Sequence, residues 1–294
     1  MLGQFNREAA MRSAPPFRAN VFVARALAPL ALALALAAPA RARDQGIAVD
    51  AELVFGVDIS YSMNRDEQEL QRNGYVQALQ SQEFLNALKS NALGKVAIAY
   101  IQWASYGDQN TVLDWTLVSS PESAKAAAEK LAAAPYRRAR RTSISGGVDA
   151  AVKMFEGNGF KGARQVIDIS GDGPNNDGRP VTEARADAIA KGISVNGLPL
   201  EGIRPYLGPA DIKDLDIYYE DCVVGGPDSF MIAVHDVKQF VDATRTKLVR
   251  EIASRPAPKY GLDTAGLVQK AQAREPRVSC MIGENLWGGG RWRN

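Results

Sequence analysis

The stretch GVDISYSMN, at residues 56–64, places an oxygen-bearing side chain at every second position. These side chains belong to Asp58, Ser60 and Ser62, and they follow an apolar run. Side chains two positions apart in an extended chain point to the same face, so the three can surround one point. A carboxylate and two hydroxyls would fill part of the shell of a hard cation such as Mg²⁺, which takes oxygen ligands and keeps several waters. The rest of the shell must come from elsewhere in the chain.

Two later residues are candidates for the missing ligands. Thr142 stands in the sequence RTSISGG at the expected start of a helix, and Asp172 ends the strand-like run RQVIDISGD. Asp58 and Asp172 would balance the charge of a dication, while neutral hydroxyls would leave it able to attract one further anionic oxygen. The alternative interpretation is that the hydroxyls cap helices and Asp172 lies in a turn, because Ser, Thr and Asp are common in both places.

The elements that must position these residues alternate along the chain. Apolar, strand-like runs cover residues 51–58, 95–105, 111–119, 164–172, 193–200 and 222–234. Helical patterns cover residues 65–89 (with a break at Ser81), 121–134, 142–156, 180–192 and 235–254. This alternation predicts an α/β fold, a Rossmann-like doubly wound and mostly parallel central sheet flanked by helices. Turn residues between the second and third runs predict a hairpin, and hence one antiparallel edge strand.

In such sheets, ligands bind at the carboxyl ends of the strands. Asp58 and Asp172 both follow strand-like runs, so the sequence predicts that they lie at the same edge. The order of D-x-S-x-S after a first strand, a later Thr before a helix and a later Asp-Gly after a strand resembles the von Willebrand factor type A domain. The resemblance covers about residues 50–254.

That resemblance implies a metal-ion-dependent adhesion site (MIDAS) formed by Asp58, Ser60, Ser62, Thr142 and Asp172. It implies Mg²⁺ as the ion, with Mn²⁺ or Ca²⁺ as alternatives, and binding to an acidic side chain of a protein partner. Several stretches, among them GISVNGLPLEG and YYEDCVVGGPDSF, are also similar to a group of secreted bacterial proteins of this type whose function is not established.

Two other interpretations of the same residues are open. The ion could act as a Lewis acid in a metal-dependent hydrolase, such as a phosphoesterase. Against this, Asp58 is followed by Ser60 rather than by a second acid, and no general base is evident nearby. The site could also be vestigial. We therefore expect a binding domain rather than an enzyme, with no catalytic residues.

A basic loop directly precedes Thr142. It covers residues 137–141 and contains Arg137, Arg138, Arg140 and Arg141. If Thr142 faces the ion, these arginines should form a rim around the site that steers an acidic partner toward it. The alternative is a solvated loop without a partner.

The N-terminal residues 1–42 have the pattern of a secretory signal peptide. Four arginines precede a 15-residue apolar run with Pro29, and the small-residue motif Ala40-Arg41-Ala42 follows. The alternative is an uncleaved membrane anchor, although the run is short for a span. Translation could start at Met1 or Met11. The remaining chain holds 30 basic and 32 acidic residues, so nothing indicates nucleic-acid binding. We expect a periplasmic or secreted protein without a stable membrane span.

The chain has two cysteines and a single histidine. In an exported protein, Cys222 and Cys280 are expected to form a disulfide, with two separate thiols as the alternative. His235 is expected at a helix start, as a cap or surface residue. A catalytic or zinc-binding role is not expected, because a His-based zinc site normally needs more than one histidine and a charge relay needs further partners. The C-terminal tail, residues 255–294, is rich in Pro, Gly and Arg and is predicted to be largely irregular.

Overall fold

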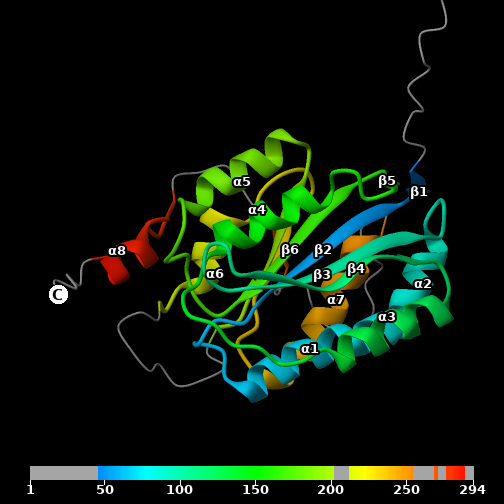
Figure 1. The fold of residues 1–294 in the computed structure, drawn as a ribbon, viewed down its shortest axis with the longest axis horizontal. Helices are drawn as coiled ribbons and strands as arrows, with labels where there is room; N and C mark the ends of the chain where they lie inside the picture. Colours follow the sequence, from blue (N-terminus) through cyan, green and yellow to red (C-terminus); the bar gives the residue numbers. More distant parts are fainter. Residues whose placement is uncertain (1–45, 202–211, 254–267, 271–275, 289–294) are drawn as a thin grey trace, which may run out of the picture. The chain divides into compact units, whose positions relative to one another are not determined.

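The computed structural model describes residues 46–201, 212–253, 268–270 and 276–288, so the predicted signal peptide lies outside the described residues. A seven-stranded sheet forms the centre of the domain (Figure 1). In spatial order its strands are β4 (Gln109–Val118), β3 (Val96–Trp103), β2 (Ala51–Asp58), β6 (Gln165–Gly171), β7 (Ser194–Pro199), β8 (Phe230–Ile232) and β9 (Val268–Lys270). A separate parallel pair joins β1 (Ile47–Val49) to β5 (Phe160–Gly162).

Helices cover both faces of the sheet, which confirms the predicted doubly wound α/β class. One face carries α1 (Arg65–Gln80), α2 (Gln82–Ser90), α3 (Pro121–Ala133) and α7 (Phe240–Ile252). The other face carries α4 (Ile144–Met154), α5 (Val181–Ala190), α6 (Leu215–Tyr218) and the π-helix η1 (Tyr219–Val223). Two further elements are the 3-10 helix η2 (Val237–Gln239) and α8 (Ile282–Gly288).

The central strands are buried over their whole length, as their continuous apolar sequences predict. β2, β3, β6, β7 and β8 run parallel to one another, so their carboxyl ends share one edge. Asp58 is the last residue of β2 and pairs in register with Trp103, the last residue of β3. Asp172 follows directly after β6. The fold therefore brings both acids to one edge of the sheet.

The helix boundaries follow local capping chemistry. Ser81 accepts a hydrogen bond from the Phe84 amide and separates α1 from α2. Ser120 caps α3, where Pro121 occupies the first position. Gly192 has a φ of +78° just after α5, a conformation that glycine adopts at low cost.

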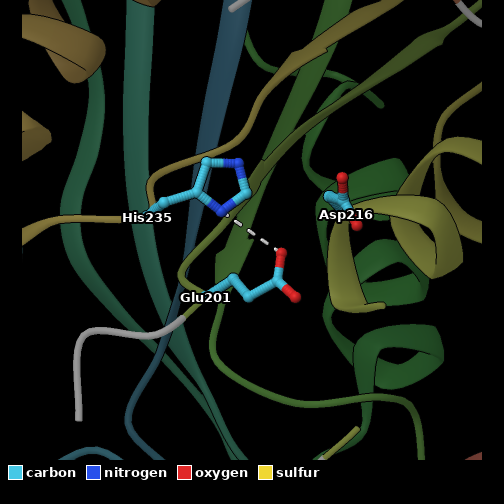
Figure 2. Close-up of side chains that lie close together, drawn as sticks. All are labelled: Glu201, Asp216 and His235. Carbon is cyan, nitrogen blue, oxygen red and sulfur yellow. Dashed lines mark ion pairs between the residues drawn. The ribbon is translucent and has the colours of Figure 1, made fainter. Parts of the chain in front are cut away.

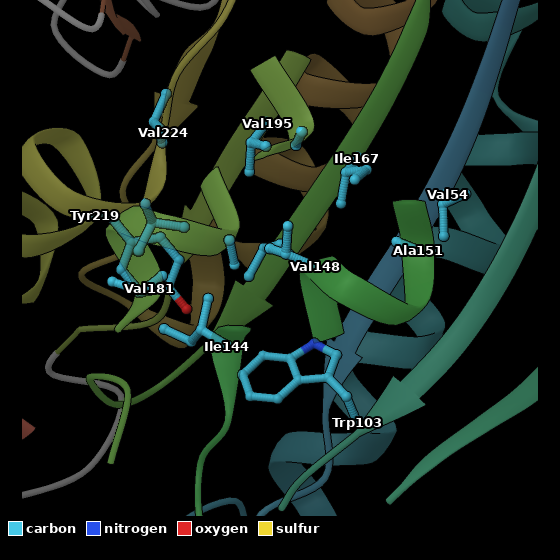
Figure 3. Packing of buried hydrophobic residues seen from close by; sticks show 14 of the residues in the cluster. Val54, Trp103, Ile144, Val148, Ala151, Ile167, Val181, Val195, Tyr219 and Val224 are labelled. Atoms are coloured by element: carbon cyan, nitrogen blue, oxygen red, sulfur yellow. The ribbon is translucent and has the colours of Figure 1, made fainter. Parts of the chain in front are cut away.

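Close packing between α4 and the sheet depends on a glycine. Trp103 is fully buried and lies under α4 within the cluster of Figure 3. A Cβ atom on Gly147 would approach Trp103 Cγ to 2.9 Å, which is closer than real Cβ contacts allow. Gly147 thus lets the start of α4, and with it Thr142, approach the carboxyl end of β3.

The structure differs from the sequence predictions in four places. Helix α7 begins at Phe240 after the 3-10 helix η2, so His235 lies ahead of the predicted helix and not at its start. Helix α4 begins at Ile144 with Ser143 as its N-cap, so Thr142 precedes the helix instead of opening it. The predicted strand at 222–234 shrinks to β8, because residues 222 and 223 complete the π-helix η1. The described part of the tail is partly regular: β9 pairs antiparallel with β8 and gives the sheet a second antiparallel edge, and α8 follows.

The predicted disulfide is confirmed, since Cys222 in η1 is bonded to Cys280 with their Cα atoms 5.4 Å apart. Arg277 adds an ion pair to Asp221, with Nε 3.1 Å from Oδ2. Asn175 donates from Nδ2 to Glu284 Oε1 in α8 at 2.7 Å. These contacts fasten residues 277–284 to the domain.

A second group of charges lies deep in the core. Lys247 Nζ on α7 is 2.5 Å from Asp168 Oδ1 on β6 and also pairs with Glu251, and all three side chains are fully buried. Asn196 donates to Glu251 Oε1 at 3.0 Å. Burial, followed by the charge of Asp168, raises the pKa of Glu251 to about 7, although Lys247 opposes the shift. Two acids thus share one lysine.

No described helix has the length and apolar character needed to cross a membrane.

Candidate metal site

Asp58 is the centre of the candidate site, at the carboxyl end of β2. Its side chain is fully buried, and its Oδ1 accepts a hydrogen bond from the Ser60 amide at 2.6 Å. This local bond turns the chain out of the strand, so that the following hydroxyls curl around the carboxylate.

A chain of short contacts connects this turn with Asp172. Ser60 Oγ lies 2.6 Å from Ser62 Oγ, and Ser62 Oγ donates to Asp172 Oδ1 at 2.6 Å. Because Ser62 and Asp172 are 110 residues apart in sequence, only the fold can bring them into contact. Four of the five predicted ligands therefore form one continuous cluster.

Thr142 lies beside this cluster and is held there by its backbone. Its amide donates to Asn176 Oδ1 at 2.9 Å, and its carbonyl accepts from the Asn176 amide at 2.8 Å. Thr142 Oγ1 is 4.0 Å from the position that a Cβ on Gly173 would take. The Thr142 hydroxyl thus lies next to the residue that follows Asp172.

The electrostatics of the cluster are unfavourable without a cation. Burial and the charge of Asp172 raise the pKa of Asp58 well above its usual range. Among the described residues, the buried Asp58 Oδ2 accepts no hydrogen bond of normal geometry. The hydrogen bonds that Ser60 and the Asp172 backbone give the carboxylate lower its pKa less than burial and the charge of Asp172 raise it. An ionised carboxylate oxygen left in this way is costly inside a protein, and a bound cation would remove the cost.

Tyr219 in η1 closes the inner side of the site. A Cβ on Gly171 would lie 2.9 Å from Asp58 Oδ2 and 3.0 Å from the Tyr219 hydroxyl, so glycine leaves room for both groups. Burial raises the pKa of Tyr219 well above its usual value, followed by the charge of Asp58. Tyr219 therefore faces the acids as a neutral phenol.

The donor set fits a hard divalent cation. Two carboxylates and up to three hydroxyls are oxygen ligands, and no sulfur or imidazole lies among the five residues. The two acids supply the charge that balances a dication. Asp58, Ser60, Ser62, Thr142 and Asp172 are the residues that would hold it.

The basic loop runs alongside the Ser60 turn. The Ala139 amide donates to the Ile59 carbonyl at 3.0 Å, and Arg138 Nη2 donates to the Tyr61 carbonyl at 2.6 Å. Its arginines point outward and are all exposed; Arg137 pairs with Asp108 at 3.3 Å. Arg141 has a φ of +69°, a strained conformation for a residue with a side chain, directly before Thr142.

A protein-family model described as "Protein of unknown function (DUF1194)" matches residues 48–256. The chain belongs to this family. The matched range contains every candidate ligand and the whole basic loop, whereas α8 and Cys280 lie beyond it. No curated protein matches the chain.

Solved structures with a similar fold include the pilus adhesin SpaC from Lactobacillus rhamnosus GG (TM-score 0.51, 13% identity, 69% of this chain and 31% of that one). A von Willebrand factor type A protein from Catenulispora acidiphila matches with a TM-score of 0.47 and 11% identity, over 71% of this chain and 48% of that one. Proximal thread matrix protein 1 from the mussel byssus, with a zinc-occupied MIDAS, matches with a TM-score of 0.48 and 15% identity, over 70% of this chain and 48% of that one. This DUF1194 chain spans about half the length of the thread matrix protein.

Sequence reasoning missed two groups that the fold reveals. Asn175 and Asn176, in the stretch GDGPNNDG, connect the Asp172 loop with Thr142 and α8, and only the run of turn residues hints at this role. A second cluster joins Glu201, Asp216 and His235, whose ligand atoms all lie within 4.8 Å of one another. Figure 2 shows the imidazole facing the Glu201 carboxylate, with Asp216 beside them.

Proposed function

We propose that this chain is an exported binding domain that holds Mg²⁺ at the edge of its sheet and captures an acidic group of a protein partner. The observation that carries the proposal is the contact chain from Asp58 through Ser60 and Ser62 to Asp172, with Thr142 beside it. A fold that only used these residues as caps would have no reason to bury Asp58 fully beside a second, half-buried acid. A bound Mg²⁺ would supply a positive charge with a coordination position open to an anionic oxygen.

The protein's own residues prepare this position in three ways. Asp58 and Asp172 bring the charge that retains the ion, while the hydroxyls add oxygen without adding charge. Asn176 holds Thr142 against the loop of Asp172, so that the ligands from three segments keep one arrangement. Tyr219 fills the inner side of the site and excludes water there.

The basic loop supports an acidic partner as the ligand. Four exposed arginines next to the Ser60 turn create a positive field around the opening, and such a field raises the rate of encounter with an acidic surface. The aromatic ring of Tyr61 is exposed as well, with Arg138 5.3 Å from its centroid. An acidic segment that also carries an apolar side chain fits this rim.

Export to the periplasm or beyond is part of the proposal. It is supported by the signal-like sequence of residues 1–42 and by the disulfide, a bond that persists in oxidising compartments.

Partner capture in the presence and absence of a chelator tests the function. Wild-type protein should retain an acidic partner from a periplasmic extract with Mg²⁺ and release it with EDTA, and Asp58→Asn should retain none. Asp114→Asn removes a similar charge at an exposed position of β4 and is the matched control. Equal capture with and without EDTA contradicts the proposal, and so does Mg²⁺-dependent turnover of phosphoester substrates that Asp58→Asn abolishes.

A further inference from the structure

A second group of metal-ligating side chains lies at the same sheet edge, on the neighbouring strands. Glu201 and His235 follow β7 and β8, and the backbone bridge between Leu200 and Val234 fixes their register. The Glu201 amide donates to the Val234 carbonyl at 2.8 Å, which places both side chains at one level of the edge. Asp216 reaches the same point from α6 (Figure 2).

The distances suit a first coordination sphere. His235 Nδ1 is 3.4 Å from Glu201 Oε2. Ligand atoms around Zn²⁺ lie at about 2.0–2.2 Å from the ion, so two of them can be at most about 4.4 Å apart. The three residues present ligand atoms within 4.8 Å of one another, and small side-chain rotations would bring all three onto one ion.

The charges of the cluster also favour a cation. The carboxylates of Glu201 and Asp216 lie in one cluster with the imidazole of His235. A dication would balance Glu201 and Asp216 and leave the imidazole as a neutral ligand.

The donor atoms of this cluster favour a different ion from the one expected at the Asp58 site. An imidazole nitrogen suits Zn²⁺ and similar transition metals, whereas Mg²⁺ and Ca²⁺ prefer sites made of oxygen alone. The His235 side chain is 51% exposed and that of Glu201 is 19% exposed, so solvent or a ligand reaches the position opposite them. Three protein ligands with one open position is the arrangement of a reactive or ligand-binding zinc centre rather than a closed structural one.

We propose that Glu201, Asp216 and His235 form a second metal site that binds Zn²⁺ or a related transition-metal dication, separate from the Mg²⁺ site at Asp58. The cluster shares no ligand with the first site. The short segment α6–η1 connects the two, with Asp216 in the cluster and Tyr219 beside Asp58.

Metal titration of untagged protein tests this inference, because a polyhistidine tag would bind the same ions. Isothermal titration with Zn²⁺ in a buffer with excess Mg²⁺ should show about one bound equivalent per chain. His235→Gln should weaken that binding at least about 100-fold, and Glu201→Gln should weaken it as well. Asp236→Asn, which removes an exposed charge next to His235, is the matched control and should bind Zn²⁺ like the wild type.

The Asp58→Asn variant separates the two sites. This variant should still bind the one equivalent of Zn²⁺ that depends on His235. When Co²⁺ is added instead of Zn²⁺, the variant should show visible absorption bands, and these bands should be absent in Asp58→Asn/His235→Gln. Folding of each variant is checked by circular dichroism. The inference is overturned if the wild type binds no Zn²⁺, if His235→Gln binds it unchanged, or if Asp58→Asn removes all of it.

Discussion

Replacing Asp58 by Asn should raise the stability of the metal-free protein and abolish its response to Mg²⁺. The Asn side chain keeps the acceptor for the Ser60 amide and removes the fully buried one of two neighbouring acids. An unsatisfied buried polar group costs about 1–3 kcal/mol, and more when it is charged, so the metal-free variant should gain stability of that order. A loss of stability in the metal-free variant would instead show that the Asp58 carboxylate makes stabilising contacts that the amide cannot replace.

The size of the Mg²⁺ effect follows from linkage. An ion that binds only the folded state stabilises it by about 2.7 kcal/mol when its concentration is 100 times its Kd. For a domain of this size, about 1 kcal/mol shifts the Tm by about 2–4 °C, so wild-type protein should gain about 5–11 °C. Differential scanning calorimetry with and without Mg²⁺ measures this gain, with Asp114→Asn as the control.

The same assay has a pH dependence of defined sign. Because the folded pKa of Asp58 is raised, its contribution to metal-free stability is full below the unfolded pKa of about 3.8 and is lost as the pH rises through the folded pKa. Mg²⁺ requires the ionised form, so the gain in Tm should grow as the pH rises through the raised folded pKa of Asp58. A gain that does not change with pH, or that survives in Asp58→Asn, would refute the reasoning.

Four further predictions concern the buried charges, the packing of α4 and the basic loop. Lys247→Met leaves two buried acids without their cation and should lower the free energy of unfolding, measured in urea, by about 3–5 kcal/mol. The double variant Lys247→Met/Glu251→Gln should recover part of this loss. No recovery would contradict the view that the two acids share the charge of Lys247. Glu251, with its pKa raised to about 7, contributes stability below about pH 4.5 that is lost as the pH rises through about 7, so Glu251→Gln should flatten the stability profile in this range. Gly147→Ala should clash with Trp103 and lower the free energy of unfolding by about 1–3 kcal/mol. It should also weaken Mg²⁺ binding, measured by titration, although no ligand is altered. Unchanged affinity would show that α4 does not position Thr142. Replacing all four arginines of the basic loop by Gln should lower the on-rate of an acidic partner and flatten its salt dependence in stopped-flow measurements, whereas an unchanged dependence would exclude steering.

Periodicity and capping chemistry predicted most of the fold. β2 begins and ends at the residues that its apolar run indicates, and Ser81 and Ser120 cap helices as their positions suggest. The errors lie where tertiary contacts decide. Cys222 begins a run that is typical of a strand, yet it is helical because η1 packs Tyr219 and Cys222 into the core beside α5.

The candidate site was predictable to the extent that its residues share a sheet edge. D-x-S-x-S and Asp-Gly mark strand ends, and parallel strands bring such ends together. The cluster at Glu201 lacks any such signal, because its members are spread over three elements and each of them is an ordinary surface residue in sequence. Only the bridge between Leu200 and Val234 shows that His235 faces an acid.

The contacts of α8 have a consequence for anyone who excises this domain. A fragment that ends where the family match ends, at residue 256, would lack Glu284 and leave Cys222 as an odd thiol. Asn175, which donates to Glu284, also accepts from the Ser145 amide and donates its own amide to the Tyr218 hydroxyl. Removing the C-terminal segment would therefore loosen the loop that carries Asp172. The functional domain thus extends beyond the residues that the family model matches.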